Sequence, residues 1–439
     1  MLTFSKTSAS IRGIAVALCA AMATAALGLS SAPAEAGTSI PSVPSPIAAD
    51  GIPRVMDDEV VPDSGVRELH QVGNIMYVGG EFNTVLSANR SNSYTRTNLF
   101  SFNANNGNMT SFAPLPTNAT GAVAGGDIYA MESTADGRYL YVGGDFRRWD
   151  GRWANKIVKL DLSDNTVVTA FKSPLKTASR VSDLQLVGGR LFVSGTMPGG
   201  VVALDPVTGL VDPYFDGVQA TGNESGYSTR IYRFSVNPAG DRMVVIGSFT
   251  AIGGQPRQQA AMLTLGPTSA GVSGWTSWWW DLDCSTRWRW YTRDVDWSLD
   301  GAHFAIVSAG GPYPGTLCDA ATWWDASDSP SEPAWVNYSG GDTFHSVHVT
   351  DMAVFVGGHF RWLDNPEGRD SKGPGAVDAK GLGAIDPETG KALVWNPNKG
   401  IGGGMGAFDL YFTDRGLWVG HFEKYISGRK HEGIGLLPF

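Results

Sequence analysis

A short phrase of the form aromatic-Val-Gly-Gly-polar-Phe recurs along the chain and constrains its fold more than any other feature. Strong copies occupy residues 77–82, 141–146 and 355–360, and weaker ones occupy residues 192–197, 244–249, 304–309 and 417–422. The seven copies begin about 50 to 64 residues apart. Self-similarity at a regular period is typical of a repeat architecture, in which each unit buries its apolar face against its neighbours.

Each copy stands in the same local context, which predicts four short strands per unit. An alternating stretch and a turn such as Asp136-Gly137 precede the phrase, and a second apolar run that ends in Leu-Asp, as at Leu160-Asp161, follows it. Four short strands per repeat are typical of a propeller blade, and glycine pairs allow one strand to pass close to the next. We therefore predict an all-β chain folded as a seven-bladed β-propeller of four-stranded antiparallel blades. Loop insertions such as residues 364–380 account for the long period.

The ends of the repeat array raise the question of how a ring would close. The last unit has three evident strands before Phe439. An open ring would leave unpaired sheet edges, which favour aggregation. We predict that residues 52–61 supply the missing fourth strand, so that an N-terminal strand closes the ring and residues 54–439 form one propeller domain.

The first 53 residues have a different composition. Residues 1–36 combine Lys6 and Arg12, an apolar stretch over residues 14–29 and the small-residue sequence Ala34-Glu35-Ala36, which together predict a secretory signal peptide. Residues 37–53 are rich in Pro, Ser and Ala and predict a linker. No later apolar run reaches about 18 residues, so we expect no membrane span in the mature chain. The protein is expected to be secreted, in free or cell-surface form.

Cleavage of the signal peptide would leave two cysteines, Cys284 and Cys318. An even pair in an oxidising compartment favours a disulfide. Two free buried thiols are the alternative.

Several phrases near the later repeats resemble a known group of proteins. They occupy residues 298–301, 310–319, 355–362 and 373–376. With the repeat itself, they resemble exported bacterial β-propellers, common in actinobacteria, that carry a VGGxF and LDxxTG repeat of the delta-60 type. The resemblance covers nearly all of residues 55–439, although the third to fifth units keep only fragments of the repeat. It implies a propeller fold and an extracellular location, and it supplies no established activity and no catalytic residues to carry over.

Charge and motifs exclude several functions. The chain has 33 Lys and Arg against 42 Asp and Glu, a formal net charge of −9, so no global positive field attracts nucleic acid. Nucleophile-elbow, zinc-protease, paired-cysteine and phosphate-loop motifs are all missing from the sequence. We therefore assign no catalytic residues and no metal site.

The innermost strand of each predicted blade brings polar side chains to the central axis. Aligned on their apolar positions, four of these strands carry an acid just before the apolar residue, at Glu68, Asp183, Asp294 and Asp409. Such a ring suits Ca²⁺, the one cofactor that the sequence leaves open. The favoured interpretation is that each acid accepts backbone N–H bonds from a neighbouring blade. Basic residues near the strand entries predict a mouth that binds an acidic sugar or another anion. These residues are Arg67, Arg180, Arg230, Arg293 and His345.

Tryptophans provide a second candidate site. Seven of the 15 lie between Trp275 and Trp297, and strand alternation would place Trp278 and Trp280 on one face, opposite Trp279. Exposed tryptophans stack on sugar rings or anchor partner proteins. The alternative is a packing layer braced by the disulfide.

These features favour an extracellular binding module, expected to be monomeric, whose ligand is a glycan, a cell-wall component or a protein. Such a module needs only rigid loops and anchoring side chains. A carbohydrate-active hydrolase or lyase that uses acidic residues near the axis is the alternative, so the sequence favours binding without turnover and leaves enzymatic activity open.

Overall fold

The computed structural model describes residues 37–175, 180–223, 227–284, 291–312, 315–398 and 406–439. All of these belong to one compact unit, residues 31–439. The predicted signal peptide, residues 1–36, lies outside the described residues. Among the described residues, no helix is long and apolar enough to cross a membrane.

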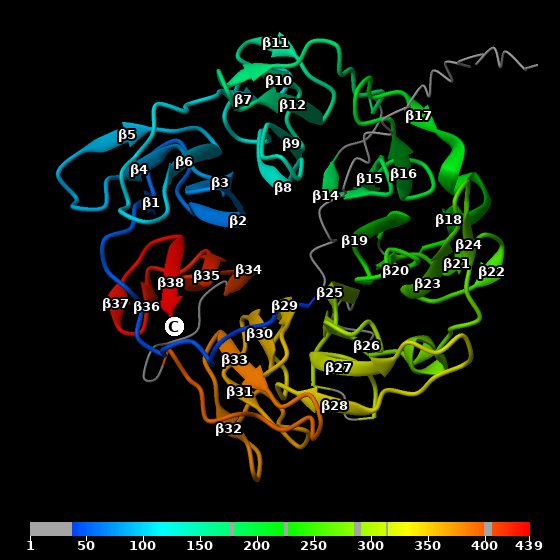
Figure 1. The fold of residues 1–439 in the computed structure, drawn as a ribbon. Coiled ribbons are helices and arrows are strands. Elements are labelled where there is room, and N and C mark those ends of the chain that lie inside the picture. Colours follow the sequence, from blue (N-terminus) through cyan, green and yellow to red (C-terminus); the bar gives the residue numbers. More distant parts are fainter. Residues whose placement is uncertain (1–36, 176–179, 224–226, 285–290, 313–314, 399–405) are drawn as a thin grey trace, which may run out of the picture. The chain divides into compact units, whose positions relative to one another are not determined.

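The regular structure of the described chain is almost entirely antiparallel sheet (Figure 1). Four sheets have four strands each. They are β8 (Ile128–Ser133), β9 (Tyr139–Gly144), β12 (Ile157–Asp161) and β13 (Thr166–Val167); β14 (Val181–Val187), β15 (Arg190–Gly195), β16 (Val201–Leu204) and β17 (Val211–Asp212); β19 (Arg230–Val236), β20 (Arg242–Ser248), β23 (Ala260–Leu265) and β24 (Ala270–Val272); and β25 (Tyr291–Trp297), β26 (His303–Ala309), β27 (Ala320–Asp325) and β28 (Trp335–Tyr338).

Three further sheets repeat this order with three strands each. They are β2 (Gly65–Val72), β3 (Ile75–Glu81) and β6 (Leu99–Asn103); β29 (Phe344–Val349), β30 (Val354–Gly358) and β33 (Leu382–Ile385); and β34 (Ala407–Thr413), β35 (Gly416–His421) and β38 (Ile434–Pro438). The first strand of each of the seven sheets faces the centre in Figure 1. These inner strands contact one another in chain order, and β34 also contacts β2.

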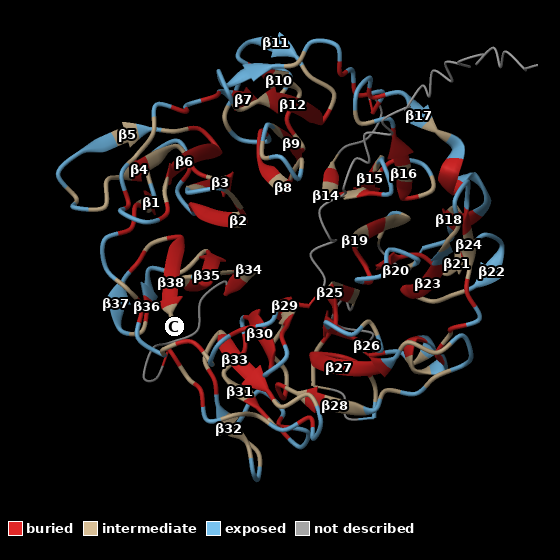
Figure 2. Ribbon diagram, in the orientation of Figure 1, coloured by how far each residue is buried: buried red, intermediate tan, exposed pale blue. Residues whose placement is uncertain are grey.

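The apolar core is divided among neighbouring sheets. Each buried cluster joins side chains of two successive sheets, and one joins the last sheet to the first, where the rings of Trp418 and Phe102 lie 5.8 Å apart. Figure 2 shows the buried residues along these strands and the exposed ones in the peripheral loops. A sheet that buries both faces against neighbours needs apolar residues at nearly every position, which explains why all six residues of β35 are buried.

The long repeat period comes from an additional hairpin between the second and third strands of five sheets. These hairpins are β4 (Thr84–Leu86) with β5 (Ser93–Thr95), β10 (Arg148–Trp149) with β11 (Arg152–Trp153), β21 (Ala251–Ile252) with β22 (Gln255–Pro256), β31 (Trp362–Leu363) with β32 (Val377–Asp378), and β36 (Tyr425–Ile426) with β37 (Arg429–Lys430). In three cases the segment before the inner strand pairs with the hairpin, as β1 (Arg54–Met56), β7 (Pro116–Thr117) and β18 (Ala220–Thr221). The described residues also form two 3₁₀ turns, η1 (Pro213–Val218) and η2 (Trp278–Asp281).

The glycine pairs act as the sequence predicted, because they allow a close approach of two strands. A Cβ added to Gly80 would lie 2.2 Å from the carbonyl oxygen of Gly65, and one added to Gly144 would lie 2.1 Å from that of Asp127. Opposite the glycine position of every repeat, the inner strand contains a β-bulge. A bulge leaves one residue unpaired and redirects its side chain. The bulged residues are Arg67, Tyr129, Ser182, Tyr232, Arg293, His345 and Phe408.

Residues 52–61 form no fourth strand of the last sheet, although the backbone N–H of Val55 donates to the carbonyl of Glu432, just before β38, at 3.1 Å. Arg54–Met56 pairs with β4 of the first sheet rather than with β38. The second and fourth sheets show the same arrangement, because in each of them the segment before the inner strand pairs with the accessory hairpin. The backbone N–H groups of Ser45 and Ala49 instead donate to the carbonyls of Pro438 and Leu436 in β38, at 2.7 and 2.8 Å.

Residues 37–53 also differ from a free linker. Ile40, Ala48 and Ile52 are buried, and Trp395 donates through Nε1 to the carbonyl of Pro44 at 2.8 Å. The composition suggested a linker because Pro and Ser mark irregular backbone, which this segment has, but irregular backbone can still pack.

Cys284 and Cys318 form the expected disulfide, with their Cα atoms 5.7 Å apart. It links the segment after η2 to the connection between β26 and β27. Replacing both cysteines by serine is expected to lower the free energy of unfolding by about 3 kcal/mol, because the unfolded chain regains the entropy of a closed loop. Urea unfolding of the double variant checks this, and an unchanged midpoint would contradict it.

Candidate functional site

The bulged residues meet at one end of the central axis and line a pocket of about 160 Å³. Each of the seven inner strands therefore contributes its bulged side chain to the lining of this pocket. Its other lining residues are Arg180, Arg233, Tyr291 and Thr292. We call this pocket the axial mouth.

Arginines at and beside the axial mouth stack on tyrosine rings. The guanidinium of Arg180 lies 4.0 Å from the ring centre of Tyr129, and that of Arg293 lies 5.0 Å from Tyr291. Arg293 also contacts Nδ1 of His345 at 2.7 Å. Arg293 donates through Nη1 to the hydroxyl of Tyr291 as well. A guanidinium offers planar N–H donors that suit bidentate bonds to a carboxylate or sulfate.

The structure brings together most of the predicted basic residues. Arg67, Arg180, Arg293 and His345 all line the axial mouth. Arg230 is not among the lining residues but stacks on Tyr232, which is, at 4.2 Å. Sequence reasoning missed the aromatic members Tyr129, Tyr232, Tyr291 and Phe408. The signal was present, because three of these four occupy the position two residues before the aligned apolar residue of their strand, as Arg67 does.

A second cavity of about 490 Å³ lies along the axis next to the axial mouth and shares Arg233 and Phe408 with it. Glu68, Asp183, Asp294 and Asp409, the predicted acid ring, line this cavity. Each accepts a backbone N–H bond from another inner strand. The bonds run from Met131 to Glu68 at 3.2 Å, from Phe234 to Asp183 at 2.9 Å, from Val347 to Asp294 at 2.9 Å and from Leu69 to Asp409 at 2.6 Å. The interpretation of these acids as backbone acceptors is confirmed.

One arginine faces the whole acid ring. Nη1 of Arg233 lies 3.7 Å from both Glu68 and Asp183 and donates to the carbonyl of Ser182 at 3.2 Å. Burial raises the pKa of Asp294 to about 6 and that of Asp409 to about 7, against the opposing effect of Arg233. The described residues contain no cluster of three or more acidic, histidine or cysteine side chains suited to a metal ion, and Ca²⁺ binding at the ring stays a prediction.

The tryptophan segment differs from the prediction. Trp280 is 2% exposed and stacks on Trp324 at 5.9 Å, so it belongs to the core and is not a ligand-binding residue. Strand alternation fails here because residues 278–281 form the 3₁₀ turn η2. Trp278 is 53% exposed, with its ring 5.0 Å from that of Trp279, and stays a candidate.

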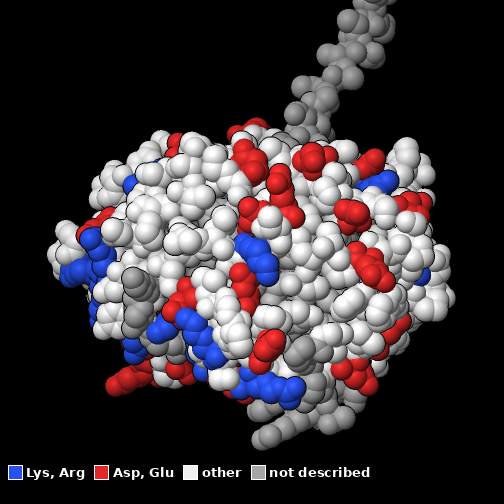
Figure 3. All heavy atoms as spheres, turned by 90° about the horizontal axis from the view of Figure 1, so that it is seen from below, with Lys and Arg blue, Asp and Glu red and all other residues white. Residues whose placement is uncertain are grey.

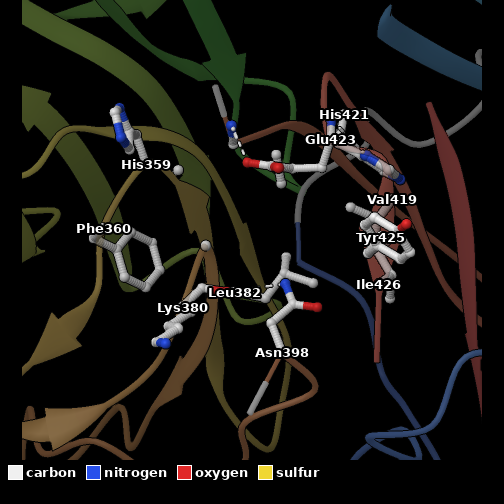
Figure 4. Close-up of a pocket in the computed structure, with 14 residues that line it drawn as sticks. His359, Phe360, Lys380, Leu382, Asn398, Val419, His421, Glu423, Tyr425 and Ile426 are labelled. Atoms are coloured by element: carbon white, nitrogen blue, oxygen red, sulfur yellow. Dashed lines mark hydrogen bonds between the residues drawn. The ribbon is translucent and has the colours of Figure 1, made fainter. Parts of the chain in front are cut away.

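A small cavity between β30 and β35 has a structural role. Figure 4 shows the side chains that line it. Its volume is about 20 Å³, room for about one water molecule. His421 accepts the backbone N–H of Glu423 through Nδ1 at 3.0 Å, and burial lowers its pKa to about 3, so the imidazole is neutral. Glu423 in turn accepts the N–H of Gly406 at 3.3 Å.

Acidic side chains are spread over the surface shown in Figure 3, in keeping with the net charge of −9, while basic side chains gather toward one margin of that view.

No family model matches this chain, and no curated protein matches it. Among solved structures, the chain is similar to a crystal structure of RRP9 WD40 repeats, with a TM-score of 0.52, 11% sequence identity and coverage of 90% of this chain and 99% of that one. The chain has a β-propeller fold. It also matches a crystal structure of the computationally designed Ika8 protein, with a TM-score of 0.46, 10% identity and coverage of 90% and 100%. At these identities the similarity concerns the fold alone.

Proposed function

We propose that this chain is an extracellular binding module that holds an anionic group of its ligand in the axial mouth. The observation that supports this most is the convergence of Arg67, Arg180, Arg293 and His345 on one pocket, with two of the arginines stacked on tyrosines. A ligand with a carboxylate or sulfate fits these donors, whether it belongs to an acidic glycan, a cell-wall component or an acidic protein segment. The disulfide agrees with an extracellular location.

The proposal includes a ring of seven blades closed by the N-terminal segment. Seven inner strands in contact, with β34 against β2, support the ring. The bonds of Ser45 and Ala49 to β38 support closure by residues 45–49, just before the segment that the sequence suggested.

Binding of an oligogalacturonate tests the axial mouth. We expect Arg180→Gln and Arg293→Gln each to weaken binding about 10-fold to 100-fold, because each loses charge-assisted hydrogen bonds. Isothermal titration calorimetry measures the affinity, and raised salt should reduce it.

Two controls accompany this titration. Arg138→Gln removes an arginine that pairs with Asp161 away from the pocket, and a neutral galactan oligosaccharide lacks the carboxylates. Equal binding of the acidic and neutral sugars, or no loss in either variant, would contradict the proposal.

A carbohydrate-active enzyme is the second candidate. The raised pKa values of Asp294 and Asp409 in the 490 Å³ cavity favour it, since a general acid must be protonated near neutral pH. Their bonds to backbone N–H groups favour a structural role instead. A screen for released sugars distinguishes the enzyme from the binding module. Only an enzyme releases sugar products, and the Asp294→Asn variant of an enzyme should no longer release them.

A further inference from the structure

A second groove lies at the periphery of the propeller, on the second sheet. Its volume is about 1060 Å³. The accessory strands β10 and β11 form one side, and the outer strand β13 with residues 169–174 forms the other. We call it the rim groove, and it shares no lining residue with the axial mouth.

Trp153 is the dominant side chain of the rim groove and is 66% exposed. The guanidinium of Arg148 lies 4.3 Å from its ring. Arg148 is itself held by bonds to the carbonyls of Ala119 and Gly151, both at 3.0 Å. The indole is therefore held in place before any ligand arrives, which lowers the entropy cost of binding.

The rest of the rim groove combines an apolar floor with polar walls. Trp149, Val158 and Phe171 are buried beneath it. Its exposed lining, apart from Trp153, Val167 and Pro174, is polar or charged. These residues are Asp150, Arg152, Asn165, Thr166, Thr169 and Lys172.

One flat aromatic face among hydroxyl, amide and charged groups matches the surface of a sugar, which has an apolar C–H face and a polar edge. A protein partner would require a larger apolar contact than these walls offer, since the cores of protein interfaces are depleted in charged residues.

We propose that the rim groove binds a neutral oligosaccharide, with a sugar ring stacked on Trp153 and its hydroxyls bonded to the polar walls. This site is separate from the axial mouth. Its binding depends on stacking rather than on charge, so high salt should leave it nearly unchanged, whereas the axial mouth should lose affinity.

Titration of the full mature chain with cellohexaose and chitohexaose, followed by tryptophan fluorescence and calorimetry, tests the proposal. At least one of the two sugars should bind, and Trp153→Ala should weaken that binding at least 10-fold, at both low and high salt. Because Trp153 is exposed, the variant should keep the wild-type melting temperature.

Trp362→Ala is the matched control, because Trp362 also lies in an accessory hairpin, with Arg361 stacked on it at 4.4 Å, and lies outside the rim groove. It should bind the sugar as the wild type does. The combined change Arg180→Gln and Arg293→Gln should also leave this binding intact. A failure of the rim-groove proposal can therefore be distinguished from a failure of the axial-mouth proposal.

Three results would overturn the proposal. The first is that neither hexasaccharide binds at millimolar concentration. The second is that Trp153→Ala and Trp362→Ala lose the same amount of sugar affinity. The third is that an acidic-aromatic peptide binds while neither sugar does, and that Trp153→Ala abolishes the binding of the peptide. The last result would identify the groove as a protein-docking site. If Trp153→Ala fails to fold, Lys172→Ala with Asn165→Ala replaces it on the wall of the groove.

Discussion

Removing residues 38–50 is expected to destabilise the protein by about 5 kcal/mol or more and to cause aggregation. This segment buries Ile40 and Ala48 and donates backbone bonds from Ser45 and Ala49 to β38, at about 1 kcal/mol for each hydrogen bond and about 2 kcal/mol for a buried Ile side chain. Without it, the outer edge of β38 loses these bonds and offers a template for pairing with another chain.

Urea unfolding and light scattering measure the two effects. Ile47→Ala is a matched control within the segment, because that side chain is 56% exposed. A truncated chain that stays monomeric and unfolds at the wild-type midpoint would disprove closure by this segment.

Replacing Arg233 by Met is expected to cost about 3 to 5 kcal/mol at pH 8, because it leaves the acid ring without its cation. The loss should be smaller at pH 5. Asp294 and Asp409 have pKa values in the folded protein of about 6 and about 7, above their unfolded value of 3.8. A carboxyl group whose pKa is higher in the folded than in the unfolded protein destabilises the folded state as the pH rises through that interval. Its contribution to the free energy of unfolding vanishes at a pH where the group is protonated in both states.

Chemical unfolding at pH 5 and pH 8 checks this sign. Arg138→Met removes an exposed partner of Asp161 and should change stability by less than about 1 kcal/mol at either pH. An Arg233 variant that loses the same stability at both pH values would show that its role is packing rather than charge compensation.

The repeat phrase connects the sequence to the site through one local device. In six of the seven repeats a glycine opposite the start of the inner strand leaves room for a bulge, since the carbonyl of the inner strand occupies the space of a Cβ at Gly80 and Gly144; in β25 the corresponding partner is Ser308. The bulge then presents one side chain of each inner strand to the axial mouth. Residues at this position vary from Ser182 to Arg293, so the backbone is repeated while the chemistry of the pocket differs from sheet to sheet.

The same argument explains which sequence predictions failed. Trp278 and Trp280 were assigned to one face on the assumption of a strand, and a 3₁₀ turn separates them into an exposed and a buried side chain. Residues 52–61 were assigned to the last sheet because the last unit has only three evident strands, and residues 54–56 pair with β4 instead. The rim groove had no sequence signal, because its walls come from segments about 15 residues apart that meet only when the hairpin folds back.

The sequence by itself determined the all-β repeat, the close approach at the glycine pairs, the Cys284–Cys318 bond and the basic character of the axis. These features follow from local patterns, since the alternation of apolar residues, the position of a glycine and the type of a residue affect the structure within a few residues. Only the tertiary structure decided which side chains line the axial mouth, that the acid ring bonds to neighbouring strands around Arg233, and that residues 45–49 lie along β38. Those choices depend on register shifts of a single residue and on contacts between segments far apart in the chain, such as Ser45 and Pro438, which no local pattern encodes.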